Sequence, residues 1–254
     1  MSRKQPQAKP KPVTNRGERI NRYLATCGLC SRREADRWIL AGRVKVNGSI
    51  VDAPGISIKA GDKVEVDGKE VEPLTKLTYI AYNKPRGLLC SRKDAKSRSL
   101  IYEHLDVAPN VQSIGRLDMD SEGLLLLTND GKLARALTRP GSLLPRTYRV
   151  RLTGKVSLEA LGTLREGGVD IGKGERSEPW DVIVDSETSG HTWLTISLRR
   201  GRWREVRRTL DAHGHQVRRL IRVRFGSVKL GDLASGKTRK LRETELIKLK
   251  LYLK

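Results

Sequence analysis

The chain has 254 residues, of which 31% are charged and 37% hydrophobic, a composition that favours one or two globular domains. Its 51 lysines and arginines against 29 acidic residues give a net charge of +22, and nucleic acid is the usual partner of such a protein. No apolar run approaches the ~20 residues of a membrane span. Three cysteines are too few for a disulfide framework, which predicts a reducing, cytoplasmic location.

Residues 1–16 are basic, contain prolines and lack acids, so we predict a disordered basic tail that touches phosphates. The segment has no apolar stretch of the kind that a secretory signal requires. A transit-peptide interpretation is weaker, because only one serine is present and no amphipathic pattern is visible.

Residues 17–75 have the pattern of a small domain with two helices and several short strands. Apolar residues from Ile20 to Cys27 recur at the spacing of one helix face. Ser31 and Glu34 have the spacing of a capping box, which predicts a second helix that ends before Gly42. Strands are expected at residues 44–46, 50–51 and 64–66, with an Asn-Gly hairpin turn between the first two.

The same domain carries a set of basic residues that we expect to form an RNA-binding face. The alternative is an ordinary solvated helix surface, which is less favoured because nearly all the charges have one sign. The residues of this basic face are Arg32, Arg33, Arg37, Arg43 and Lys45.

A linker near residue 73 leads into a longer region, residues 76–240. Alternating apolar residues predict strands at 77–82, 146–152, 193–198 and 217–225, and helical patterns occur at 132–138, 158–164 and 203–213. Strands outnumber helices, so we predict an α+β fold whose larger domain contains a mainly antiparallel sheet. Residues 241–254 are assigned to a basic C-terminal tail.

Acidic residues gather in the segment 114–131, IGRLDMDSEGLLLLTNDG, although the chain as a whole is basic. The four leucines predict a buried strand, and Asp118 precedes it in a loop flanked by Gly115 and Gly123. A carboxylate near RNA phosphates is repelled, so it needs a task or a cationic partner. Two other interpretations stay open: a solvated acidic turn, or a carboxylate pair that holds Mg²⁺.

Gly115-Arg116-Leu117-Asp118 followed by SEGLLLLTNDG resembles the catalytic-loop motif of pseudouridine synthases, specifically the RsuA/RluB type that acts on ribosomal RNA. Four further stretches resemble motifs of that family in the same order, at 83–87, 146–150, 201–208 and 219–226. Ser121 stands where the family often has threonine, and Arg146 where it has lysine; both substitutions keep the polar character. Residues 17–75 resemble the S-four RNA-binding domain, a small α/β module.

The resemblance implies roles for particular residues. Asp118 would be the catalytic carboxylate, Tyr148 would stack on a flipped uracil, and Arg207 would keep Asp118 ionised. Arg116 would help to extrude the target nucleotide. Further contacts to RNA are expected from Lys84, Arg204, Arg208 and Arg222.

The family's reaction breaks the bond from ribose to ring nitrogen 1 of uridine and remakes it to ring carbon 5, so no cofactor is expected. No metal site is expected either, because Cys27 and Cys30 lack a second ligand pair. Motif details lean towards 23S ribosomal RNA or a ribosomal-subunit precursor as partner, with 16S RNA as the alternative, and a monomer is the default. A non-catalytic RNA-binding or ribosome-assembly factor is the competing hypothesis. A methyltransferase would need a glycine-rich cofactor loop, which is not evident.

Overall fold

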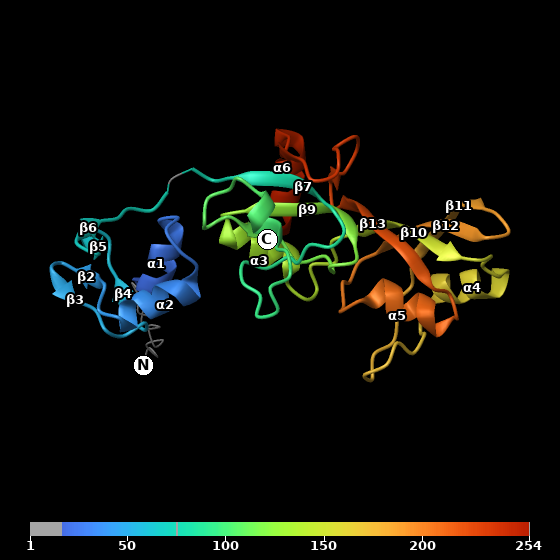
Figure 1. The fold of residues 1–254 in the computed structure, drawn as a ribbon, viewed down its shortest axis with the longest axis horizontal. Helices are drawn as coiled ribbons and strands as arrows, with labels where there is room; N and C mark the ends of the chain where they lie inside the picture. The colour runs from blue at the N-terminus through green and yellow to red at the C-terminus, as the bar shows by residue number, and fades with distance from the viewer. Residues whose placement is uncertain (1–16, 75, 254) are drawn as a thin grey trace, which may run out of the picture. The chain divides into compact units, whose positions relative to one another are not determined.

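A computed structural model describes residues 17–74 and 76–253, so the predicted tail at 1–16 lies outside the described residues. The chain divides between residues 75 and 76 into two compact units, each described by itself below (Figure 1). None of the helices in the described ranges has the length and apolar character of a membrane span.

The first unit contains helix α1 (Ile20–Thr26) and helix α2 (Arg32–Leu40). Ser31 begins α2 because its hydroxyl accepts a hydrogen bond from the Glu34 backbone N–H at 3.3 Å. The helix ends before Gly42, whose φ of +68° suits glycine. Both helices therefore start and stop where the sequence predicts.

Short strands complete the first unit. They are β1 (Glu18–Arg19), β2 (Val44–Val46), β3 (Ser49–Ile50), β4 (Ser57–Ile58), β5 (Val64–Val66) and β6 (Lys69–Glu70). Four of them form an antiparallel sheet in the order β3-β2-β5-β6, and β1 pairs with β4. The apolar residues at helical spacing, including Ile20, Leu24 and Ile39, pack with strand valines into one core.

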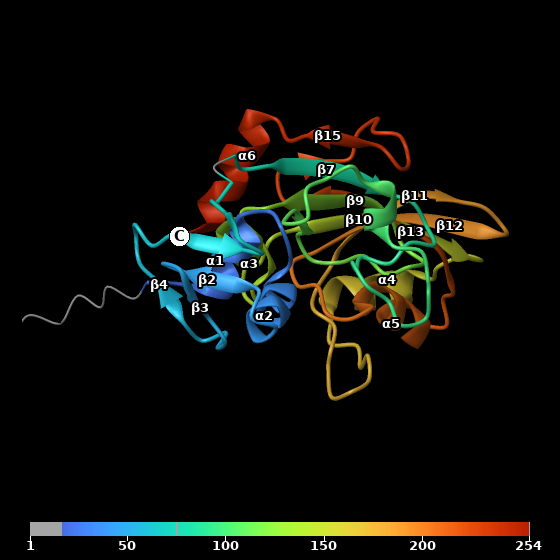
Figure 2. The same ribbon diagram turned by 60° about the vertical axis from the view of Figure 1, so that its left-hand side comes forward.

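The second unit is built around a nine-stranded sheet with the main order β11-β12-β10-β13-β9-β7-β15. Figure 2 shows β7, β9, β10 and β13 side by side in this sheet. The pairing of β13 with β9 is parallel, and the other pairings among the described residues of this sheet are antiparallel. The prediction of a mainly antiparallel α+β fold is confirmed. The strands are β7 (Tyr79–Lys84), β8 (Gln112–Ser113), β9 (Glu122–Thr128), β10 (Arg146–Thr153), β11 (Asp181–Glu187), β12 (His191–Leu198), β13 (Val217–Phe225), β14 (Val228–Lys229) and β15 (Thr238–Lys240).

The four leucines of β9 are consecutive because both faces of this strand are covered. Leu124 and Leu126 pack with helix α3 (Gly131–Thr138) and helix α6 (Glu243–Lys250). Leu125 and Leu127 belong to the other core, to which helix α4 (Leu158–Glu166) and helix α5 (Glu205–Ala212) contribute. An alternating strand with one solvated face could not hold such a run.

Residues 241–253 are not a separate tail, and this part of the domain prediction is wrong. They contain α6 and a short 3-10 helix (Leu251–Leu253), and Leu249 is fully buried in the core that includes α3. The Arg239 guanidinium on β15 donates two 2.8 Å hydrogen bonds to the Glu245 carboxylate, which fixes α6 beside the sheet. Lysines at the surface concealed this apolar face in the sequence.

Candidate active site

The loop at residues 114–121 lies where β9 changes neighbours. β7 pairs with one edge of β9 along most of its length, while the other edge pairs first with β13 at Glu122 and Gly123 and then with β8 at Leu127 and Thr128. The loop leaves the end of β8 and returns at the start of β9. The exchange of one strand neighbour for another therefore leaves room for a loop that carries functional side chains.

Gly123 permits the close parallel pairing of β9 with β13. Its φ is +97°, and a Cβ atom there would lie 2.4 Å from the Arg222 carbonyl oxygen and 2.9 Å from the Arg222 nitrogen. Any other residue would therefore force β9 and β13 apart. The glycine fixes where the loop joins the sheet.

Every backbone carbonyl from residue 117 to residue 121 accepts a hydrogen bond. The donors come from the segment 84–90, from α5 and from the loop itself. They are Cys90 Sγ to Leu117 O at 3.3 Å, Ser121 N to Asp118 O at 3.1 Å, Gly87 N to Met119 O at 2.7 Å, Arg207 Nη2 to Asp120 O at 3.0 Å and Lys84 Nζ to Ser121 O at 2.9 Å. This loop is held in one conformation by partners from distant parts of the chain.

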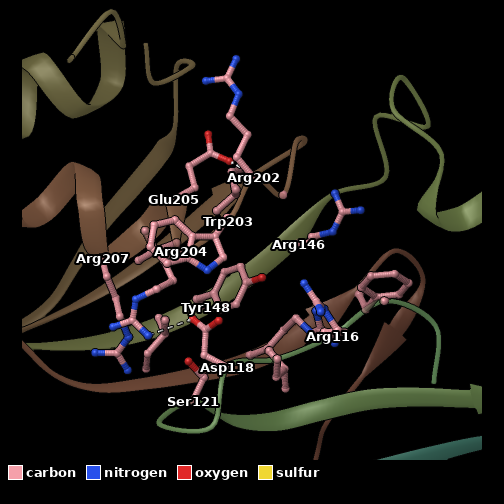
Figure 3. Close-up of a pocket in the computed structure, with 18 of the residues that line it drawn as sticks. Arg116, Asp118, Ser121, Arg146, Tyr148, Arg202, Trp203, Arg204, Glu205 and Arg207 are labelled. Atoms are coloured by element: carbon pink, nitrogen blue, oxygen red, sulfur yellow. Dashed lines mark hydrogen bonds and ion pairs between the residues drawn. The ribbon is translucent and has the colours of Figure 1, made fainter. Parts of the chain in front are cut away.

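Asp118 lines a pocket of about 320 Å³. Figure 3 shows its carboxylate beneath the ring of Tyr148, with Arg204 and Arg207 on one side and Arg116 on the other. The nearest cationic atom is Arg204 Nη1, 3.7 Å from Asp118 Oδ2, and the Asp118 side chain is 31% exposed. A carboxylate with an arginine neighbour and open space beside it is suited to act as a nucleophile or base.

Asp120, which the sequence analysis did not single out, is the main partner of the two arginines at the start of α5. Arg204 Nη1 lies 3.2 Å from Asp120 Oδ1, and Arg207 Nε lies 3.3 Å from Asp120 Oδ2. Burial alone would raise the pKa of Asp120, but the hydrogen bond from Arg204 and the charge of Arg207 outweigh it, so the pKa lies below its ordinary value. Asp120 therefore stays ionised at neutral pH.

Arg207, expected to keep Asp118 ionised, forms its ion pair with Asp120 in the structure, and the charges of Arg207 and Asp118 still attract each other through space. Arg207 contacts the carboxylate and the carbonyl of Asp120, and Arg204 is the closer cation to Asp118. Asp120 lies two positions after Asp118 in the loop, and its carboxylate is the one that contacts Arg207 on α5. Arg207 acts on Asp118 only through the field of its charge.

Tyr148 on β10 is 9% exposed and forms one wall of the pocket. It is directly opposite Ile196 on β12 and Arg222 on β13. Trp203, just before α5, lines the same pocket and is 56% exposed, with Lys173 Nζ 4.3 Å from the centre of its ring. The pocket thus offers aromatic surfaces both in its wall and at an exposed position.

Two of the residues predicted to contact RNA are engaged with partners inside the protein. Lys84 is fully buried, and its ammonium group donates to the carbonyls of Pro85 and Ser121. Burial lowers the pKa of Lys84. Arg208 donates to the carbonyls of Ile171 and Gly172 and pairs with the Glu175 carboxylate at 2.7 Å, so all three of its nitrogens are engaged. Both side chains fix the architecture of the site.

Arg116 and Arg222 line the pocket, although Arg222 is only 2% exposed. In the first unit the basic face is less uniformly positive than expected, because Arg37 pairs with Glu34 and Arg43 pairs with Asp67. Arg32, Arg33 and Lys45 complete this face. The ion pairs of Arg37 and Arg43 are exposed to solvent, and such pairs are weak enough for an RNA phosphate to replace the carboxylate.

The thiols of Cys27 and Cys30 lie in the core of the first unit. Burial raises the pKa of Cys27 to about 12 and that of Cys30 to about 11, so both thiols are protonated at neutral pH. In residues 17–74 and 76–253 no three His, Cys, Asp or Glu side chains are arranged to hold a metal ion. In the described structure, Cys27 and Cys30 serve as apolar packing groups.

Comparison with known proteins gives two family matches. Residues 78–212 match the family described as RNA pseudouridylate synthase, and residues 18–64 match the S4 domain. A solved structure described as a pseudouridylate synthase is 30% identical, with a TM-score of 0.67, and the alignment covers 92% of this chain and all of that one.

Curated relatives match along nearly the whole chain. A protein of Aquifex aeolicus named as an uncharacterized RNA pseudouridine synthase is 40% identical over 91% of this chain and 93% of its own length. A protein of Xylella fastidiosa named ribosomal large subunit pseudouridine synthase B is 38% identical over 93% of this chain, which spans 52% of that protein.

Proposed function

Because this chain belongs to the RNA pseudouridylate synthase family, we propose that it isomerises a uridine of ribosomal RNA, with Asp118 as the catalytic carboxylate. The observation that carries the assignment is the position of Asp118 in a pocket, below an aromatic ring and beside Arg204. The target base leaves its stack to enter this pocket.

In the proposed reaction Asp118 acts at the sugar while the bond between C1′ and N1 breaks. The detached uracil turns within the pocket, C1′ bonds to C5, and the proton on C5 is lost as N1 gains one. The ring of Tyr148 supports the uracil by stacking, which contributes roughly 1–3 kcal/mol per base, and its hydroxyl can take part in the proton transfer at C5. Arg116 occupies the place that the extruded nucleotide vacates.

Asp120 has a supporting role in this proposal. It holds Arg204 and Arg207 by ion pairs, and this keeps Arg204 beside the Asp118 carboxylate. The loop carbonyls, each with its hydrogen-bond donor, keep the carboxylate in place without rearrangement when RNA binds.

The substrate we propose is large-subunit ribosomal RNA. The name of the Xylella fastidiosa relative supports this choice, and so does the resemblance of residues 204–208 and 220–224 to the large-subunit branch of the family. The S4 match over residues 18–64 supports a tethering role for the first unit, whose basic face would contact RNA away from the pocket. We also propose a cytoplasmic location, which agrees with an rRNA substrate.

Release of tritium from ribosomal RNA labelled at C5 of uridine tests the chemistry. Wild-type protein should release tritium, and Asp118→Asn should reduce the rate by at least about 1,000-fold, as removal of other catalytic groups does. Asp211→Asn, an exposed acid on α5, is the matched control and should leave the rate unchanged. Normal release by Asp118→Asn would refute the assignment of Asp118. RNA binding without release by the wild type would favour the non-catalytic factor.

Pseudouridine maps of both ribosomal RNAs, from cells with and without the gene, test the substrate. We expect one pseudouridine of 23S RNA to disappear with the gene. A lost site in 16S RNA would overturn the large-subunit proposal, and unchanged maps of both RNAs would overturn the ribosomal one.

A further inference from the structure

Two arginines of the pocket, Arg146 and Arg222, have no acidic partner among the described residues. The Arg222 side chain donates one hydrogen bond, from Nε to the Leu124 carbonyl at 2.7 Å, and its Nη2 is buried without a partner. Arg146 Nη1 donates to the carbonyls of Leu144 and Arg199 at 3.1 and 2.8 Å. Arg204 and Arg207, in the same pocket, are both paired with carboxylates.

These two arginines lie close together and close to Tyr148. Arg222 on β13 is directly opposite Tyr148 on β10, and opposite residues of an antiparallel pair project to the same face with Cβ atoms about 5 Å apart. The guanidinium carbons of Arg146 and Arg222 lie 5.4 and 4.9 Å from the centre of the Phe225 ring. Figure 3 shows Arg146 on the far side of Tyr148 from Arg204 and Arg207.

The proximity of the two charges has an energetic consequence. Burial lowers the pKa of Arg146, and repulsion from the charge of Arg222 adds to the lowering. The charge of the buried acid Glu205 acts in the opposite direction on Arg146, but Glu205 forms no ion pair with either arginine, and one of its oxygens accepts the Arg202 backbone N–H at 2.9 Å. Two desolvated like charges without an ion-pair partner are costly, and a bound anion would lower that cost.

The RNA itself supplies a suitable anion. A uracil carbonyl could accept a hydrogen bond from Arg222, but it is neutral and would leave the charges uncompensated. A phosphodiester carries one negative charge and has oxygens that match the planar donors of a guanidinium. Every nucleotide that enters the pocket brings such a group attached to its ribose.

We propose that Arg146 and Arg222 form an anion-binding subsite that holds the phosphodiester adjoining the target uridine. This inference rests on the proposed function, since it requires the uridine to enter the pocket. β13, which carries Arg222, lies between β10, which carries Tyr148, and β9, in which Gly123 follows the Asp118 loop. A phosphate held there anchors the ribose between the aromatic ring and the Asp118 carboxylate, so the subsite positions C1′ for reaction.

The test replaces a single phosphate by a neutral group. RNA stem-loops are prepared with a methylphosphonate on the 5′ or the 3′ side of the mapped target uridine, and a third carries it five nucleotides away. In wild-type protein one of the two adjoining replacements should lower kcat/KM by about 10- to 100-fold, the loss expected for a charged hydrogen-bonded contact. The distant replacement should lower it by less than about threefold.

Substitutions then locate the effect. In Arg146→Gln the adjoining methylphosphonate should lower kcat/KM by less than about threefold, because one of the two arginines that contact the phosphate is already missing. Arg151→Gln, an exposed arginine on the opposite face of β10, should retain the full cost. Arg222 lies in the core, and its loss risks unfolding, so Arg222→Lys is the second variant. It keeps the charge but not the fork, and should show an intermediate cost in kcat/KM at a temperature where its unfolding curve shows it to be folded.

Equal wild-type kcat/KM on the native RNA and on both adjoining methylphosphonate RNAs would overturn the subsite. So would an undiminished cost in Arg146→Gln together with Arg222→Lys. If the wild type produces no pseudouridine on native RNA, the proposed function fails. The subsite is then tested by the affinities of the protein for the same RNAs, measured by fluorescence anisotropy. Equal affinities would then reject it, and a loss of about tenfold or more on one adjoining replacement would support it.

Discussion

The loop that carries Asp118 and the basic face of the first unit are both rich in charged residues, but they are built in opposite ways. In the loop, buried or half-buried cations are tied to carboxylates and to backbone carbonyls. On the basic face, Arg33 is exposed, Arg32 donates a hydrogen bond, among the described residues, only to the neutral Asn21 side chain, and the ion pairs of Arg37 and Arg43 are exposed. The loop thus depends on the exact positions of its groups, whereas the face depends on its electrostatic field.

The largest expected effect comes from the join between the loop and the sheet. Gly123→Ala would place a Cβ atom 2.4 Å from the Arg222 carbonyl oxygen in a backbone with positive φ. We expect a loss of about 3 kcal/mol or more in the free energy of unfolding, measured by urea titration. Gly115→Ala is the control, because its Cβ would meet only Thr138 Cγ2 at 3.8 Å, and it should cost about 1 kcal/mol. Equal losses would show that the close approach of β9 and β13 is unimportant.

Lys84 gives the next largest effect. Lys84→Met leaves the carbonyls of Pro85 and Ser121 without their donor, which should cost about 1–3 kcal/mol of stability. The salt dependence of RNA binding should not change, since the ammonium group is buried. Lys155→Met, at an exposed position, should leave stability within about 0.5 kcal/mol of the wild type. A reduced salt slope in Lys84→Met would restore Lys84 as an RNA contact.

Asp120→Asn should lower kcat by about tenfold with little change in KM, because Arg204 and Arg207 lose their counter-charge and no longer hold the loop. Single-turnover tritium release measures this. Restoration of the rate by Asp120→Glu, which returns the charge, would separate positioning from general damage to the fold. A change in KM alone would instead indicate that Asp120 affects only RNA binding.

The same variant gives a pH test. The folded-state pKa of Asp120 is below its ordinary value, so the ionised carboxylate stabilises the fold above pH ~4, and this contribution disappears as the pH falls through the folded-state value. The wild type should therefore be more stable than Asp120→Asn at about pH 6, and the difference should shrink steadily below about pH 4. A difference that is constant from pH 6 to pH 3 would contradict the ion-pair assignment.

The smallest effects should come from the basic face. Arg32→Gln and Arg33→Gln should each weaken RNA binding only a few-fold and reduce the slope of log affinity against log salt by up to about 0.9, with kcat unchanged. Arg37→Gln and Arg43→Gln should have smaller effects, because Glu34 and Asp67 already compensate these charges. Filter binding between 50 and 200 mM salt measures all four. A loss of kcat in any of them would mean that the face does more than attract RNA.

Several elements of the fold were predictable because their signals are local. The hydroxyl of Ser31 caps α2, the Asn-Gly turn joins β2 to β3, and α3 begins at an aspartate cap, each as neighbouring residues require. The run of four leucines predicted a buried strand, but its central place, with both faces covered, became visible only in the structure. The motif points to Asp118, whereas no local signal distinguishes Asp120 in the same acidic run.

The sequence by itself determined the charge, the two-domain order, the main helices and strands, and the motif that contains Asp118. Tertiary structure alone decided which cation meets which carboxylate. Asp118 and Arg204 are 86 positions apart, and a difference of one helical turn or one strand register sends a guanidinium to a different partner. The burial of Lys84, the engagement of Arg208 and the lack of a partner for Arg222 Nη2 among the described residues depend on the same long-range packing, which no local pattern of residues encodes.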